Sequence, residues 1–165
     1  MSAVSSLEKS LGDLFKSAPK LPANGKKALV QYLPWINAIL GALMLFAAYS
    51  LWHWADKVNN AVDYVNELTR AFGGQEVVGD RFSVGIWIGV VLLVVEAVLY
   101  LAAFIPTKAR QKKGWNLLFY AMLVNIVYAV VVLFTDYGGA GNLIGYLIGA
   151  VIGFYLLFQI RDSYS

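Results

Sequence analysis

Four long apolar runs constrain this chain more than any other feature of its sequence. They cover residues 34–54, 82–104, 115–134 and 143–160, and none of them contains Lys or Arg. A helix of about 20 apolar residues crosses a bilayer. Backbone groups in lipid must be satisfied within the segment, which favours helices over strands. We therefore expect an all-α integral membrane protein whose four spans pack as a four-helix bundle.

Composition agrees with this class and narrows the chemistry. Hydrophobic residues make up 59% of the chain and charged residues only 14%, against about a quarter charged in ordinary globular chains. Cysteine is absent and His53 is the single histidine, which excludes disulfides, thiolate chemistry and a multi-His metal site within one chain. No phosphate-binding loop or G-x-S-x-G motif is present. We therefore expect no catalytic residues, no cofactor, no metal and no enzymatic activity.

The distribution of basic residues predicts the orientation of the spans. Ten of the 13 Lys and Arg residues fall in the N-terminal segment, in the connection around residues 105–114 and in the tail, and three fall on the other side. Cytoplasmic flanks of membrane proteins carry the excess of Lys and Arg. The pattern predicts a multi-pass protein of the cell membrane with both termini in the cytoplasm. The same rule explains the basic run 108–113, so we expect no nucleic-acid partner.

Two segments outside the spans have the pattern of amphipathic surface helices. In the basic arm, residues 1–33, Leu7, Leu11, Leu14 and Phe15 recur at helical spacing. The arm either attaches to anionic lipid headgroups or is simply a positive-inside anchor. Between the first two spans, residues 56–72 alternate an apolar and an acidic polar face, and this helix either lies on the outer membrane surface or caps the bundle. Residues 161–165 form a short cytoplasmic tail.

Glycines in the fourth run recur at intervals of four. Successive members of such a series rotate by only about 40° around a helix, so they form a groove that admits a neighbouring backbone. Two interpretations are open. The groove packs within the chain, which is favoured, or it serves a homo-oligomer or a pore-lining helix. In the second run, Gly85 and Gly89 contribute to a related face of small residues, and in the first run Asn37, Gly41 and Ala48 form a similar stripe. Stripes of this kind face protein rather than lipid. The candidate helix-packing residues are Gly141, Gly145, Gly149, Gly153, Gly85 and Gly89.

Glu96 is the single carboxylate within the four runs, and it shares a stripe with Gly89 and Tyr100. An ionised carboxylate inside a bilayer costs at least about 2.5 kcal/mol. We therefore expect Glu96 to be neutral and hydrogen-bonded to a polar neighbour. Asn125, at the centre of the third run and near Tyr128 on its face, is the best candidate. These four residues form either a structural hydrogen-bond network or an ion or proton site.

The sequence favours one function and leaves one alternative. The favoured function is that of a small non-enzymatic membrane protein with a structural or assembly role, which associates with itself or with other membrane proteins through the glycine groove. The alternative is a small channel or a proton- or cation-coupled transporter that uses Glu96 and Asn125. The lipid bilayer is the one partner expected under both.

Overall fold

The computed structural model describes residues 3–72, 84–133 and 140–165, and within these ranges every regular element is a helix. The predicted all-α class is confirmed. The predicted span boundaries at Phe82 and Phe134 lie outside the described residues. The elements in chain order are α1 (Ala3–Phe15), α2 (Ala23–Ala71), α3 (Val84–Lys108), α4 (Lys112–Leu133), α5 (Ala140–Gln159) and the short 3₁₀ helix η1 (Arg161–Ser163).

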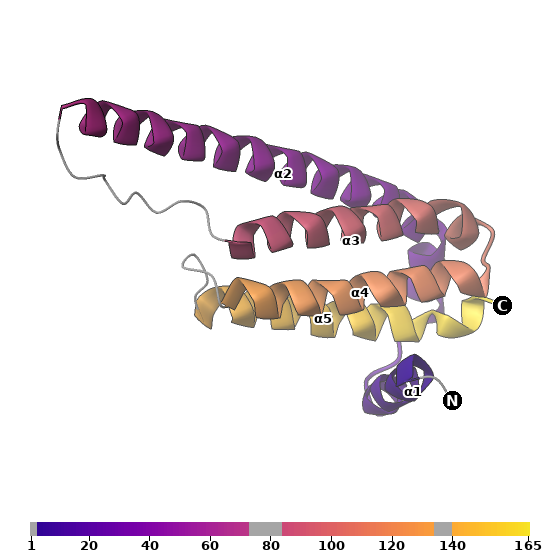
Figure 1. Cartoon of the computed structure of the whole chain (residues 1–165). Helices are drawn as coiled ribbons and strands as arrows, with labels where there is room; N and C mark the ends of the chain where they lie inside the picture. The colour runs from indigo at the N-terminus through magenta and orange to yellow at the C-terminus, as the bar shows by residue number, and fades with distance from the viewer. Residues whose placement is uncertain (1–2, 73–83, 134–139) are drawn as a thin grey trace.

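The four long helices pack in sequence order. Figure 1 shows α2 against α3, α3 beside α4, and α5 along α4, with each helix reversing direction relative to the one before it. Among the described residues, α2, α3 and α4 are long and apolar enough to cross a membrane, whereas the apolar part of α5, Ile144–Gln159, is shorter. By length and composition, three helices are therefore consistent with a membrane protein. The fourth span remains a prediction.

α2 differs from the sequence prediction, because one continuous helix of 49 residues replaces two separate elements. At 1.5 Å per residue it is about 73 Å long, more than twice the thickness of the hydrocarbon core. Residues 42–72 contain neither Gly nor Pro, so nothing ends the helix between the first apolar run and residues 56–72. The expected surface helix or cap is wrong: this segment extends α2 past the start of α3 (Figure 1).

Small residues bring α2 close to α3, as the stripe in the first apolar run predicts. Asn37, Gly41 and Ala48 are all buried. A Cβ added at Gly41 would lie 2.7 Å from Cγ of Leu101 and 3.1 Å from the carbonyl oxygen of Ala97. A side chain at position 41 would therefore displace Leu101 and press on the α3 backbone, so Gly41 allows the close approach of the two helices.

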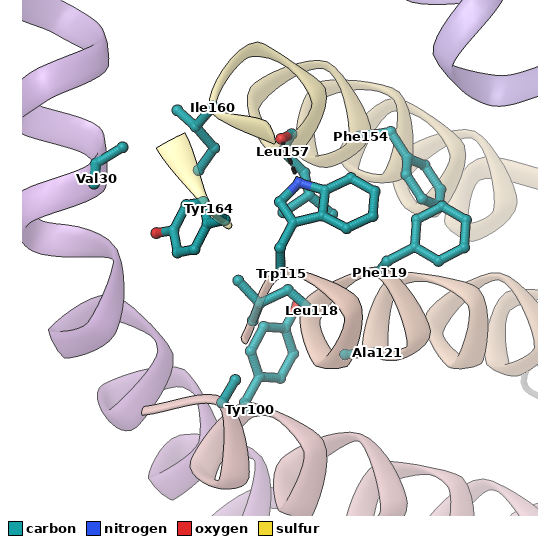
Figure 2. Packing of buried hydrophobic residues seen from close by; sticks show 11 residues of the cluster. Val30, Tyr100, Trp115, Leu118, Phe119, Ala121, Phe154, Leu157, Ile160 and Tyr164 are labelled. Carbon is teal, nitrogen blue, oxygen red and sulfur yellow. Dashed lines mark hydrogen bonds between the residues drawn. The ribbon is translucent and has the colours of Figure 1, made fainter. Parts of the chain in front are cut away.

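The largest buried cluster ties α4 to the C-terminal end of α5. Figure 2 shows Trp115 at its centre, with the indole Nε1 donating a hydrogen bond of 2.9 Å to the carbonyl oxygen of Leu157. Phe119 stacks on Trp115 with ring centroids 5.4 Å apart and meets Phe154 edge-on. A buried indole needs a partner for its N–H, and here a carbonyl of the neighbouring helix supplies it. This contact fixes the axial position of α5 against α4.

The amphipathic helix expected in the N-terminal arm is present as α1, and it packs against the C-terminal end of α5 (Figure 1). Phe15 stacks on Phe158 with ring centroids 5.8 Å apart. The hydroxyl of Tyr155 donates a hydrogen bond of 2.7 Å to the carbonyl oxygen of Pro19, in the connection to α2. The arm is therefore folded onto the helices that follow it.

The arm, the tail and the loop between α3 and α4 gather at one end of the molecule. The backbone N–H of Ser165 donates to the carbonyl oxygen of Arg110 at 3.1 Å, and that of Lys112 donates to the carbonyl oxygen of Ser165 at 2.9 Å. Arg110 occupies the left-handed region, with φ 55°. The three segments that carry the excess of basic residues in the sequence are thus neighbours in space.

Candidate functional site

A polar pair lies between α3 and α4, far from both chain ends in sequence. The Glu96 side chain is 1% exposed, and its Oε1 accepts a hydrogen bond of 3.3 Å from Nδ2 of Asn125. The contact predicted between these residues is therefore present. The other carboxyl oxygen, Oε2, is buried and has no hydrogen-bond partner among the described residues. A proton on that oxygen would make the group neutral, which suits apolar surroundings better than an uncompensated charge.

Two tyrosines flank this pair, one on each helix. Tyr100 follows Glu96 by one turn on α3 and is 7% exposed. Tyr128 follows Asn125 by one turn on α4 and is half-buried. Its ring meets Tyr146 of α5 edge-on, with centroids 5.6 Å apart. The four candidate polar residues therefore belong to the α3–α4 contact, and Tyr128 extends the group towards α5.

Gly89 shapes the same contact. It is buried, and a Cβ added there would lie 3.4 Å from Cε2 of Tyr128. Gly85, one turn earlier, is half-buried. A Cβ at position 89 would therefore make an ordinary van der Waals contact with the Tyr128 ring, which packs over this glycine in the α3–α4 contact.

Asn37 of α2 is a polar residue that the sequence analysis did not count among the site residues. It is 1% exposed, and its Nδ2 has no hydrogen-bond partner among the described residues. With Tyr100 it lines a cavity of about 200 Å³ whose other walls are mostly aliphatic side chains of α2, α4 and α5. Asn37 belongs to the small-residue stripe of the first apolar run, so its burial was predictable from the sequence. The cavity was not, because it forms where four helices meet.

The glycine groove of α5 is largely uncovered by the chain's own helices. Gly141, Gly145 and Gly149 are exposed, and a Cβ added at any of them would meet no described neighbour within 4 Å. Gly153 alone is covered, since a Cβ there would collide with the side chain of Met122 on α4. Among the described residues, packing within the chain, the favoured interpretation of the sequence, is therefore present at Gly153 but not at the other three glycines.

These three glycines are exposed because α5 packs against α4 through a different face. Ala150, Phe154 and Leu157 are the residues it buries, and they lie on the opposite side of the helix from Gly141 and Gly145 at 100° per residue. Isoleucines border the open groove, and each is more than half exposed: Ile144, Ile148 and Ile152.

The described residues contain no group of three acidic or histidine side chains positioned to hold a metal ion. No protein-family model, curated protein or solved structure matches the chain. The chemistry of the polar pair and the shape of the α5 surface are therefore the basis for a functional assignment.

Proposed function

We propose that this chain is a small, non-enzymatic protein of the cell membrane that assembles with a second copy of itself through the glycine groove of α5. The observation that carries the proposal is that Gly141, Gly145 and Gly149 have open space in front of them. The same groove could instead receive a helix of another membrane protein in a larger complex, and this would be a second form of the same structural role.

Glycine destabilises a helix, so a row of glycines on α5 indicates a compensating contact at this surface. Each glycine in a helix interior is less favourable than alanine by about 1 kcal/mol in water, and lipid chains gain nothing from its small size. A second helix gains from it because the two backbones can approach closely. The isoleucines beside the groove supply apolar surface for the same contact. A row of glycines on an exposed face is therefore better explained by a helix than by lipid.

The test compares Gly149→Leu with Val151→Phe. Both add bulk to exposed positions of α5, but Val151 lies off the groove. We expect fluorescence energy transfer between labelled copies in liposomes to fall strongly for Gly149→Leu and to persist for Val151→Phe. Circular dichroism should be unchanged in both, because Val151 is exposed and a Cβ at position 149 has no described neighbour within 4 Å. Equal energy transfer in the wild type and Gly149→Leu would contradict the proposal.

A second candidate function is transport of protons or cations, and one observation favours it. Oε2 of Glu96 is buried without a partner, and an acidic residue in a membrane helix is a functional-site hypothesis in its own right. Under this hypothesis Glu96→Gln keeps the contact with Asn125 but abolishes pH-dependent flux into liposomes, because an amide does not exchange its proton as a carboxyl does. Flux in the wild type that is lost in Glu96→Gln would favour transport over assembly, and absence of flux in both would remove its support.

A further inference from the structure

The docking of α1 against α5 creates a cleft at the end of the molecule where the basic segments gather. It has a volume of about 630 Å³ and is lined by α1, by the connection to α2 and the first turn of α2, and by the end of α5. Phe15 and Phe158, which stack on each other, form part of its wall. The cleft therefore joins an apolar wall to a rim built from the basic arm.

Charge in the cleft is unevenly compensated. Two of its three acidic residues are engaged within the protein: Glu8 pairs with Arg161 at 2.6 Å and with Lys112 at 3.5 Å, and Asp13 pairs with Lys16. The third, Asp162, is exposed at the rim. A hydrogen bond from Lys16 and the charge of its ammonium hold the pKa of the Asp13 carboxyl below its usual range, so Asp13 is ionised at neutral pH. The positive charges that remain must come from other residues of the lining.

Three lining lysines remain: Lys9, Lys20 and Lys26. None of them makes an ion pair with any part of the chain that the structure describes. Lys26 is half-buried, whereas its neighbour Lys27 is exposed and does not line the cleft. The three lining lysines outnumber the one remaining carboxylate, Asp162, so the partly apolar cleft keeps a net positive charge that attracts an anion.

We propose that this cleft binds the phosphate headgroup of an anionic membrane lipid. Lysine ammonium groups bind phosphate as point charges, and basic pockets beside membrane helices on the cytoplasmic side bind lipid headgroups. The apolar side chains of α1 favour a lipid over a soluble anion, because Leu7 and Leu14 are 42% and 70% exposed and would enter the acyl boundary as an amphipathic helix does. The cleft thus lies at headgroup level.

A second feature of the fold suits the acyl chain of such a lipid. The apolar cavity of about 200 Å³ begins at Leu29, one turn along α2 from Lys26, and is bounded by Ile160 at the end of α5. The N–H of Leu21, between Lys20 and Lys26 in sequence, donates to Oε1 of Gln159 at 3.2 Å, which holds the connection near the end of α5. Headgroup and chain sites would therefore occupy the same end of the molecule.

The experiment uses the full chain in nanodiscs with equal amounts of phosphatidylglycerol and phosphatidylcholine, and native mass spectrometry reads the lipids that stay bound. We expect the wild type to retain phosphatidylglycerol preferentially. Each lysine near a membrane surface contributes about fivefold, so the double variant Lys20→Gln/Lys26→Gln should lose on the order of 25-fold in preference. The matched variant Lys27→Gln/Lys113→Gln removes the same charge from exposed positions outside the cleft and should keep most of the preference.

Three outcomes would overturn the proposal. The first is a wild type without preference for the anionic lipid. The second is an equal loss in both double variants while circular dichroism shows both folded, since diffuse surface attraction would then explain the binding. The third is displacement of the bound lipid by micromolar glycerol phosphate, which would assign the cleft to a soluble anion.

Discussion

The buried polar side chains of Glu96 and Asn37 have atoms without a hydrogen-bond partner among the described residues. Glu96 has one hydrogen-bond donor, Asn125, for two carboxyl oxygens. Asn37 has no partner for its amide nitrogen among the described residues and borders a cavity. Unpaired groups of this kind are destabilising unless water or a ligand meets them. They are therefore the positions where single substitutions are most informative.

Replacement of Glu96 separates hydrogen bonding from charge. Glu96→Gln keeps a carbonyl oxygen that can accept the bond from Asn125, so we expect thermal stability in detergent close to that of the wild type. Glu96→Leu removes the acceptor and should destabilise the protein by about 0.6–2 kcal/mol, the range for hydrogen bonds between membrane helices. Val95→Leu, on the exposed face of α3, is the control and should be neutral. A Gln variant as unstable as the Leu variant would show that the ionised carboxylate is required.

At the scale of single elements, sequence reasoning identified helix faces better than helix ends. The stripe of Asn37, Gly41 and Ala48 was expected to face protein, and it does. The length of α2 was missed because the change from apolar to acidic composition after Trp54 looked like a boundary. Composition changes where a helix leaves lipid, but the helical backbone can continue where no strong breaker stands, and residues 42–72 contain neither Gly nor Pro.

The partner of the α5 glycines was missed for a different reason. Spacing shows which residues share a face, but it does not show which face meets α4. The face that meets α4 is the one that carries Ala150, Phe154 and Leu157. Their packing against Trp115 and Phe119 depends on the shapes of both helices, which the spacing within α5 does not contain. The polar pair was easier to find, because one acidic residue and few amides were available within the apolar runs.

The distance between two labels placed on either side of Trp54 distinguishes a straight α2 from a bent one. Spin labels on Ile39→Cys and Glu67→Cys, both exposed positions, should lie about 42 Å apart along one helix. A right-angle bend at Trp54, as needed for a helix lying on the membrane surface, would shorten this to about 30 Å. Double electron–electron resonance in liposomes measures the distance. A value near the shorter figure would contradict the continuous helix.

At the scale of the whole molecule, the fold sorts charge by position along the helices. The basic arm, the loop after α3 and the tail share one end, where backbone hydrogen bonds join Ser165 to Arg110 and Lys112. The far end of α2 carries the acidic residues Asp63 and Glu67. The excess of Lys and Arg at the basic end predicts that this end lies in the cytoplasm.

Topology is tested by single cysteines labelled with an impermeant maleimide in intact cells, and the chain has no native cysteine. Ser6, Gln111 and Glu67 are suitable because all three are exposed. Thr107 and Asn66, which look like connection residues in the sequence, are 1% and 7% exposed and would label poorly. We expect Glu67→Cys alone to react from outside. Reaction at Gln111→Cys in intact cells, with lysed cells as the positive control at every site, would contradict the orientation.

Assembly through α5 is the central claim, and oxidative crosslinking in native membranes tests it most directly. A disulfide forms only when two Cα atoms come within about 7 Å, so Ile148→Cys, beside the open groove, should yield a disulfide-linked dimer. Val91→Cys on α3 is 61% exposed and should stay monomeric, and adding Gly149→Leu to Ile148→Cys should abolish the dimer. Absence of a dimer from Ile144→Cys, Ile148→Cys and Ile152→Cys, or equal crosslinking at Val91→Cys, would contradict self-association through this helix.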